Sequence, residues 1–168
     1  AAPMQWGSRT LHTLALGGLL IAGSATMCMA EAPVDQPPKI QLAMLLDTSN
    51  SMDGLIGQAK SQLWRIVNEF VSARQGGRQP SLEVALYEYG NNTLNAESQW
   101  VRQVLPFTSD LDLFSDKLFG LHTNGGDEYC AAVMGKALDQ LCWSSAPSDL
   151  RTIFIAGNEP FNQGPADY

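Results

Sequence analysis

Residues 40–51 of the chain, IQLAMLLDTSNS, decide the fold. Residues 40–46 are almost entirely apolar, which is typical of a central strand that is covered on both faces of a sheet. Asp47, Ser49 and Ser51 follow at the end of this expected strand. Open α/β sheets bind their ligands outside the carboxyl ends of the strands. Carboxylate and hydroxyl oxygens are hard ligands of the kind that Mg²⁺ prefers.

Helices and further strands alternate along the rest of the chain. The patterns predict helices at 52–74, 111–119 and 128–143, and strands at 82–89, 100–105 and 151–156. We expect Ser51 to cap the first helix and Asp127 to cap the last. The fold class is therefore α/β, with a doubly wound, mostly parallel sheet, helices on both faces and one antiparallel edge hairpin. Since such sheets usually have five or six strands, we expect the sequence to be a fragment of a longer protein.

The composition is that of one domain with a low content of charged residues. The chain has 168 residues, of which 45% are hydrophobic and 16% are charged, and its formal net charge is −7. An acidic chain is a poor partner for nucleic acid, because phosphate binding needs clustered Lys and Arg. A divalent cation or a basic partner surface suits this charge better.

The first thirty residues have the three-part layout of a secretory signal peptide. Arg9 is their only charge, residues 14–22 form a short apolar core, and Ala30 precedes Glu31. We expect residues 1–30 to be a cleaved signal and the protein to be exported, either periplasmic or secreted. The alternative is a retained membrane anchor at residues 11–30. Residues 31–39, EAPVDQPPK, read as a Pro-rich linker, and residues 40–168 as the folded domain.

The pairing of Cys130 and Cys142 stays open at this stage. Both fall in or beside the last predicted helix, whose ends would lie about 18 Å apart. A disulfide needs Cα atoms within about 7 Å. The two could pair only if the helix begins after Cys130 and the chain bends back. Otherwise each pairs elsewhere, or both are small buried hydrophobes.

The pattern D-x-S-x-S at residues 47–51 places one acid and two hydroxyls on a single turn. Uncharged hydroxyl ligands leave a bound cation with net positive charge, so that it can take a carboxylate from another molecule. The alternative is that Asp47 and Ser51 only cap a helix.

Two later loops offer further oxygen ligands. Thr123 lies in a Gly-rich loop that ends at Asp127, and Asn158 and Glu159 follow the last strand. Successive βα loops converge at one edge of a doubly wound sheet, so these side chains could reach Asp47. Asp127 and Glu128 could approach as well. The alternatives are that these two acids stabilise a helix start without any metal, and that Asn158 and Glu159 form a turn before Pro160.

Residues 45–52, LLDTSNSM, followed by a long helix, resemble the von Willebrand factor type A (vWA) family. The resemblance extends over residues 40–168. It implies a metal-ion-dependent adhesion site in which Asp47, Ser49 and Ser51 hold Mg²⁺ or another divalent ion such as Mn²⁺ or Ca²⁺. It implies Thr123 as the ligand from the second loop.

The third loop departs from the family pattern, which is apolar-Thr-Asp-Gly after the strand. Residues 155–159 read IAGNE, with Gly157 near the place of the expected Asp. Asn158, Glu159 or water would then fill that position. The stretches GGDEYC at 125–130 and GNEPF at 157–161 resemble an exported bacterial branch of the family.

These features predict a divalent-metal-dependent protein-binding module, not an enzyme, whose partner offers a carboxylate. One alternative is a structural scaffold with a degenerate metal site. Another is a Mg²⁺-dependent phosphoryl-transfer enzyme with Asp47 as nucleophile. Enzymes of the D-x-D type need a second acid two residues on, and Ser49 cannot act as a general acid or base near neutral pH.

Overall fold

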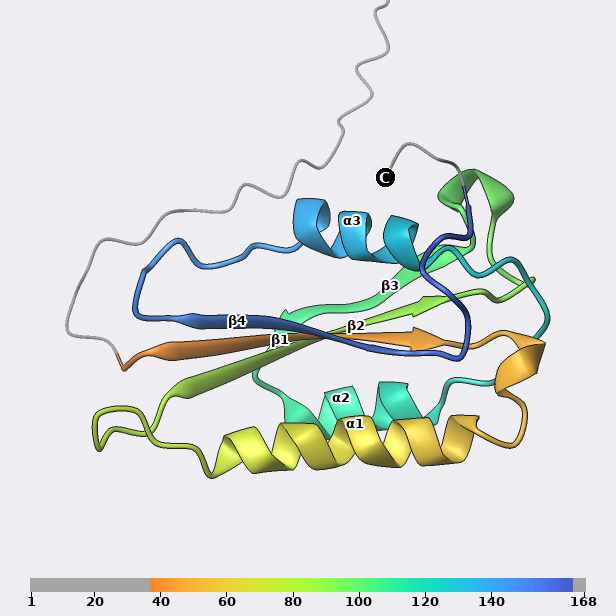
Figure 1. Cartoon of the computed structure of the whole chain (residues 1–168). Helices are drawn as coiled ribbons and strands as arrows, with labels where there is room; N and C mark the ends of the chain where they lie inside the picture. Colours follow the sequence, from red (N-terminus) through yellow and green to blue (C-terminus); the bar gives the residue numbers. More distant parts are fainter. Residues whose placement is uncertain (1–36, 165–168) are drawn as a thin grey trace, which may run out of the picture.

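The computed structural model describes residues 37–164, which form a four-stranded sheet with helices on both faces (Figure 1). The strands are β1 (Lys39–Asp47), β2 (Ser81–Tyr89), β3 (Val101–Thr108) and β4 (Leu150–Ala156). The helices are α1 (Ile56–Val71), α2 (Leu111–Phe119) and α3 (Cys130–Gln140), with short 3₁₀ helices η1 (Asn50–Met52) and η2 (Ala96–Ser98). The expected signal peptide at 1–30 and most of the expected linker at 31–39 lie outside the described residues.

The strand order is β3-β2-β1-β4, with β1 parallel to both of its neighbours and β3 antiparallel to β2 at an edge. This confirms the predicted α/β class and the single antiparallel pair. In the register, Asp47 is opposite Tyr89, and Leu46 is opposite Ala156. The carboxyl ends of β1, β2 and β4 therefore lie side by side. The segments that follow these three strands start from one edge of the sheet.

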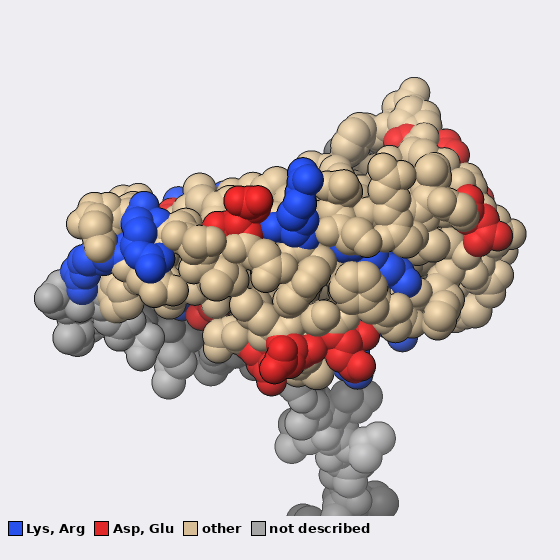
Figure 2. Space-filling model, turned by 90° about the horizontal axis from the view of Figure 1, so that it is seen from below, with Lys and Arg blue, Asp and Glu red and all other residues tan. Residues whose placement is uncertain are grey.

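Helices α1 and α2 cover the lower face of the sheet, and α3 covers the upper face (Figure 1). Figure 2 shows the protein from below, where Lys, Arg, Asp and Glu side chains are scattered among broad uncharged areas. On this face the basic side chains do not form the continuous stripe that phosphate binding needs.

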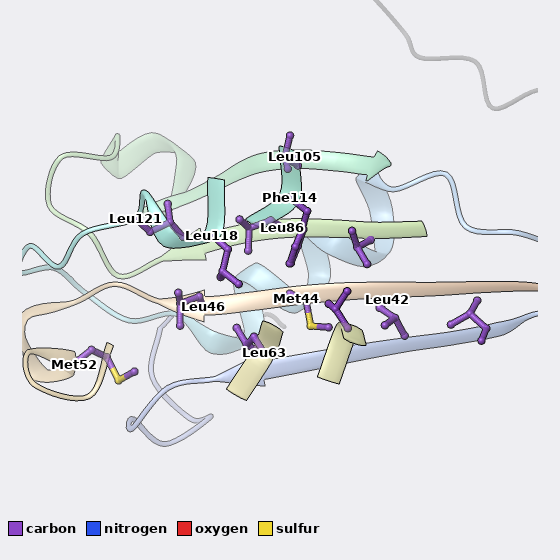
Figure 3. Close-up of a cluster of buried hydrophobic side chains, with 13 residues drawn as sticks. Leu42, Met44, Leu46, Met52, Leu63, Leu86, Leu105, Phe114, Leu118 and Leu121 are labelled. Carbon is purple, nitrogen blue, oxygen red and sulfur yellow. The ribbon is translucent and has the colours of Figure 1, made fainter. Parts of the chain in front are cut away.

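Alternation along β1 divides its side chains between two cores. Leu42, Met44 and Leu46 are fully buried toward α1 and α2 (Figure 3), whereas Ala43 and Leu45 are fully buried toward α3. Successive residues of a strand point to opposite faces of the sheet. Burial of each large apolar side chain contributes about 1.5–3 kcal/mol. These contacts hold β1, and with it Asp47, in a fixed position at the centre of the sheet.

The first helix begins later than the sequence predicted. After η1, Gly54 adopts a left-handed backbone conformation with φ +82°, and α1 starts at Ile56. The residue at the N-cap of α1 is Leu55, which makes no side-chain capping bond. The expectation that Ser51 caps this helix is therefore wrong. The turn at Gly54 separates Ser51 from the helix and leaves its hydroxyl free for other contacts.

The last helix is shorter than the predicted 128–143. It begins at Cys130, and the N-cap position is occupied by Tyr129 without a side-chain capping bond. Capping by Asp127 is therefore wrong as well. The segment before Cys130 packs closely against the end of β2. The approach is so close that a side chain at Gly126 would collide with the backbone of Gly90. It follows that this segment passes the sheet edge in a non-helical conformation.

Lys60 links α1 to the segment that leads into the second loop. Its side chain is buried, and the ammonium group donates hydrogen bonds to the carbonyl oxygens of Phe119 (3.1 Å) and Leu121. Burial lowers the pKa of Lys60. The two accepting carbonyls lie at and just beyond the end of α2, where helical carbonyls lack partners. Lys60 thus fixes the start of the loop that carries Thr123.

Leu46→Ala is expected to lower the free energy of unfolding by about 2–5 kcal/mol, because the cavity lies in the fully buried core beside Asp47. Urea denaturation monitored by circular dichroism measures the loss. Leu138→Ala is the control, since Leu138 is 58% exposed on α3 and its loss should cost less than about 0.5 kcal/mol. Equal effects of the two substitutions would contradict the assignment of the core.

Candidate metal site

Backbone hydrogen bonds join the segments that meet at the carboxyl edge of the sheet. The Thr48 amide donates to the carbonyl oxygen of Tyr89 at 2.9 Å, which ties the loop after β1 to the end of β2. The Asn124 amide donates to the carbonyl oxygen of Thr48, also at 2.9 Å. The Asn91 side chain donates to the carbonyl oxygen of His122 at 3.1 Å. The first and second loops therefore share one hydrogen-bonded framework.

Asp47 lies beneath these loops with no exposed surface. Its Oδ1 accepts the backbone N–H of Ser49 at 2.8 Å. Its Oδ2 is buried and has no hydrogen-bond partner among the described residues. Burial raises the pKa of Asp47, the Ser49 hydrogen bonds oppose the rise, and the negative charge of Glu159 adds to it. A buried carboxylate oxygen without a partner is costly, and a cation is one group that would remove this cost.

The hydroxyls of the D-x-S-x-S turn form a short chain that reaches the third loop. Ser49 Oγ and Ser51 Oγ are 2.8 Å apart. Ser51 Oγ donates to Asn158 Oδ1 at 2.9 Å, and Asn158 Nδ2 donates back to the carbonyl oxygen of Ser51 at 3.2 Å. No side-chain capping bond is made at the start of η1 or α1. The structure therefore does not support the alternative that these residues only cap a helix.

Thr123 and Asp127 have different surroundings from those of Ser49 and Ser51. The Thr123 hydroxyl donates to Asp53 Oδ1 at 2.5 Å, so it joins the second loop to the first through Asp53. Asp127 is exposed to solvent. The structure brings Asp47, Ser49, Ser51 and Asn158 together directly, whereas the roles of Thr123 and Asp127 as metal ligands stay predictions.

Glu128, which the sequence offered together with Asp127 as an acid that could approach the site, lies closer to its centre than Asp127. It is half-buried, and burial raises its pKa. Hydrogen bonding with the Ser49 side chain opposes this rise, and the negative charges of Asp47 and Glu159 add to it. Sequence reasoning could not distinguish two adjacent acids, because their directions depend on where the helix begins.

Glu159 is also half-buried, and its role as a metal ligand stays a prediction. Its Oε2 accepts a hydrogen bond from Gln163 Nε2 at 2.8 Å. The charge of Glu159 raises the pKa of both Asp47 and Glu128. The third loop therefore supplies one amide oxygen, from Asn158, and one nearby negative charge.

Two glycines leave space around the Asp47 side chain. Gly90 has φ +77°, and a Cβ atom there would lie 3.0 Å from Asp47 Oδ1 and 3.0 Å from Glu128 Cγ. A Cβ atom at Gly157 would collide with the Tyr89 hydroxyl and lie 3.1 Å from Asp47 Cβ. The Tyr89 hydroxyl thus occupies the direction that a side chain at position 157 would need, which explains why that position carries no acid.

Tyr89 and Cys130 form a buried pair beneath the site. Cys130 Sγ donates to the Tyr89 hydroxyl at 3.4 Å, and burial raises the pKa of each group. A thiol with a raised pKa is mostly protonated at neutral pH and therefore unreactive. Cys130 is a free thiol and Cys142 is disulfide-bonded, so the two do not pair with each other.

The donor set determines which kind of ion it fits. Within residues 37–164, no group of three or more His, Cys, Asp or Glu side chains is placed to hold a metal ion. Asp47 Oδ2 and the two serine hydroxyls instead make a hard, oxygen-only set with little negative charge. Such a set fits Mg²⁺, which is commonly held by one or two carboxylates and keeps several waters.

None of the helices within the described part of the chain has both the length and the hydropathy needed to cross a membrane.

Comparisons with known proteins find similarity in structure. No family model matches the sequence, and no curated protein matches it. The structure of three N-terminal domains of the type V pili tip protein Mfa5 from Porphyromonas gingivalis superposes with a TM-score of 0.51 and 17% identity, over 69% of this chain and 19% of that one. The von Willebrand factor domain of the same Mfa5 superposes with a TM-score of 0.49 and 16% identity, over 68% of this chain and 36% of that one. The pilus adhesin SpaC from Lactobacillus rhamnosus GG superposes with a TM-score of 0.45 and 14% identity, over 60% of this chain and 12% of that one.

The chain thus spans less than half the length of each of these structures. At these identities the similarity concerns the fold. The four-stranded sheet with helices on both faces therefore shares its fold with the superposed part of the Mfa5 N-terminal domains.

Proposed function

We propose that the carboxyl edge of the sheet binds a divalent cation, Mg²⁺ in the first instance, and that the domain is a protein-binding module without catalytic activity. The single observation that carries the proposal is the fully buried Asp47, whose Oδ2 has no partner among the described residues. Asp47, Ser49 and Ser51 would hold the ion. Thr123 is the proposed ligand from the second loop, with Asn158, Glu159 and Asp127 as additional or indirect contributors.

The charge of the donor set indicates what the partner offers. One carboxylate and two hydroxyls do not neutralise a doubly charged ion, so the bound ion would attract a further anionic ligand. An acidic side chain of another protein is such a ligand, because a carboxylate is a hard oxygen donor. The ion would thus act as a bridge between Asp47 and the carboxylate of the partner.

The setting that we propose is an exported surface or periplasmic protein. The fold is similar to the N-terminal domains of a pili tip protein, and residues 1–30 read as a secretory signal. Both observations favour an adhesive or interaction role outside the cytoplasm.

Two other functions are weaker. A phosphoryl-transfer enzyme would need a second acid at position 49, where the chain has Ser49, which is fully buried and bonded to Ser51. A scaffold with a degenerate site is favoured by the absence of an acid at Gly157. Thermal unfolding that responds neither to Mg²⁺ nor to EDTA would support the scaffold, since a ligand bound only by the folded state raises its stability.

Isothermal titration calorimetry is expected to show Mg²⁺ or Mn²⁺ binding that Asp47→Asn abolishes. Because this substitution also removes a buried charge while keeping the acceptor for the Ser49 amide, the metal-free variant should be at least as stable as the wild type at pH 7. Asp139→Asn, at an exposed position of α3, is the control and should bind normally. Metal binding by Asp47→Asn equal to that of the wild type would contradict the proposal.

Short peptides with one acidic side chain are expected to bind the domain in Mg²⁺ and to be released by EDTA. The matched control replaces the acid of each peptide by its amide, which keeps the shape and removes the anionic ligand. Surface plasmon resonance measures both series. If acid and amide peptides bind equally, or if EDTA has no effect, the partner does not bind through the ion.

Gly157→Ala is expected to destabilise the protein by about 1–3 kcal/mol, because its methyl group collides with the Tyr89 hydroxyl. Tyr89→Phe in the same chain should recover part of this loss, which denaturation of the four proteins of the double-mutant cycle measures. Gly57→Ala is the control: a Cβ atom there meets nothing within 4 Å, and Ala should favour α1. Additive effects at 89 and 157 would refute the steric explanation.

A further inference from the structure

The position of Glu128 is unusual for a carboxylate that has no role. Its side chain passes over Gly90, where a Cβ atom would lie 3.0 Å from Glu128 Cγ and equally close to Asp47 Oδ1. It also interacts with the side chain of Ser49, which is fully buried. Two carboxylates and one proposed hydroxyl ligand therefore surround the same small space.

A role of Glu128 in stabilising the helix start does not explain this position. The first turn of α3 contains no acidic residue, and Glu128 lies before the N-cap residue, Tyr129. Acids are favourable chiefly within the first turn of a helix. The neighbouring Asp127 has the same charge but stays exposed. Something other than the helix accounts for the inward direction of Glu128.

Glu128 lies close to other acids of the carboxyl edge. Asp47 and Glu159 are the negative charges that act on it. The basic side chains of the ion pairs that the structure gives, Lys39–Glu83, Arg102–Glu88 and Lys117–Asp116, engage other acids. Like charges in a partly desolvated space repel strongly. A divalent cation between them would turn this repulsion into attraction.

Asp47 provides the independent observation that points to a ligand. Its Oδ2 is buried, has no hydrogen-bond partner among the described residues, and belongs to a side chain with no exposed surface. The third loop cannot add an acid at position 157, because the Tyr89 hydroxyl excludes a side chain there. In the third loop the nearest acid is therefore Glu159, whereas Glu128 approaches Asp47 from the segment before α3.

We infer that Glu128 supplies the second negative charge of the metal site, in place of the acid that the third loop lacks. This inference rests on the proposed function of the same site. Glu128 would act from outside the direct ligands, beside Asp47 and Ser49, so that it strengthens attraction of the ion while a coordination position stays open for the partner's carboxylate. The domain would thus attract its ion with two carboxylates, one from the first loop and one from the segment before α3.

Titration of the full chain with Mg²⁺ and Mn²⁺ by calorimetry tests the inference, with Glu128→Gln as the main variant. The amide keeps the size of the side chain and removes its charge, so the dissociation constant should rise at least about tenfold. Asp139→Asn is the control, because it removes an equal charge from an exposed position of α3 that has no part in the site; its dissociation constant should match that of the wild type. Thermal unfolding of each metal-free variant checks that the fold is intact.

The outcomes separate the inference from the proposed function. If Asp47→Asn abolishes binding while Glu128→Gln binds like the wild type, the role of Glu128 is refuted and the metal site remains. If Glu128→Gln and Asp139→Asn weaken binding equally, only the net charge of the domain matters, and the inference again fails. If the wild type binds neither ion, both proposals fall. Glu128→Asp, which keeps the charge but shortens the side chain, should also weaken binding and serves if the amide variant does not fold.

Discussion

The carboxylate of Asp47 is held under three segments of chain with one oxygen bonded and the other without a partner among the described residues. This arrangement depends on β1, which is fixed between β2 and β4 by parallel pairing and by buried side chains on both faces. The packing energy of the two cores is large enough to keep a carboxylate in a place that it would otherwise avoid. The conformation of the loops at the carboxyl edge of the sheet depends on this buried carboxylate, because every nearby loop must fit around the Asp47 side chain.

The loops fit around the Asp47 side chain mainly because glycines stand at their closest contacts. Gly90 and Gly157 have no side chains where Asp47, Glu128 and Tyr89 come close, and Gly126 lets the second loop contact the end of β2. Hydrogen bonds then connect the loops to one another, from Ser49 through Ser51 to Asn158. The edge is thus a preformed framework of oxygen atoms whose positions are set by the backbone.

Much of this architecture could be predicted from the sequence. The apolar run before Asp47, the alternation of residues 82–89 and the helix at 111–119 have clear periodicities, and the observed elements agree closely with them. The convergence of the D-x-S-x-S turn with Asn158 also followed, since parallel strands end at one edge. Helix starts were harder to predict. The left-handed turn at Gly54 and the contact between Gly126 and Gly90 depend on tertiary structure, which local patterns do not contain.

Whether Asp127 or Glu128 turns toward the site was hard to predict for the same reason, because it depends on tertiary structure. Both acids precede the helix, and the non-helical segment that carries them leaves Asp127 exposed and Glu128 half-buried. The bond from Thr123 to Asp53 was likewise beyond sequence reasoning, because it joins residues 70 positions apart. The exclusion of a side chain at Gly157 required the position of Tyr89, which belongs to another strand.

The burial of Asp47 has a consequence for when the domain becomes stable. A carboxylate whose buried oxygen has no partner lowers the stability of the ion-free fold, and a bound ion would restore it. On the proposal made above, the folding equilibrium would therefore follow the supply of free divalent ions around the protein. Such a dependence would make the domain least stable wherever divalent ions are scarce.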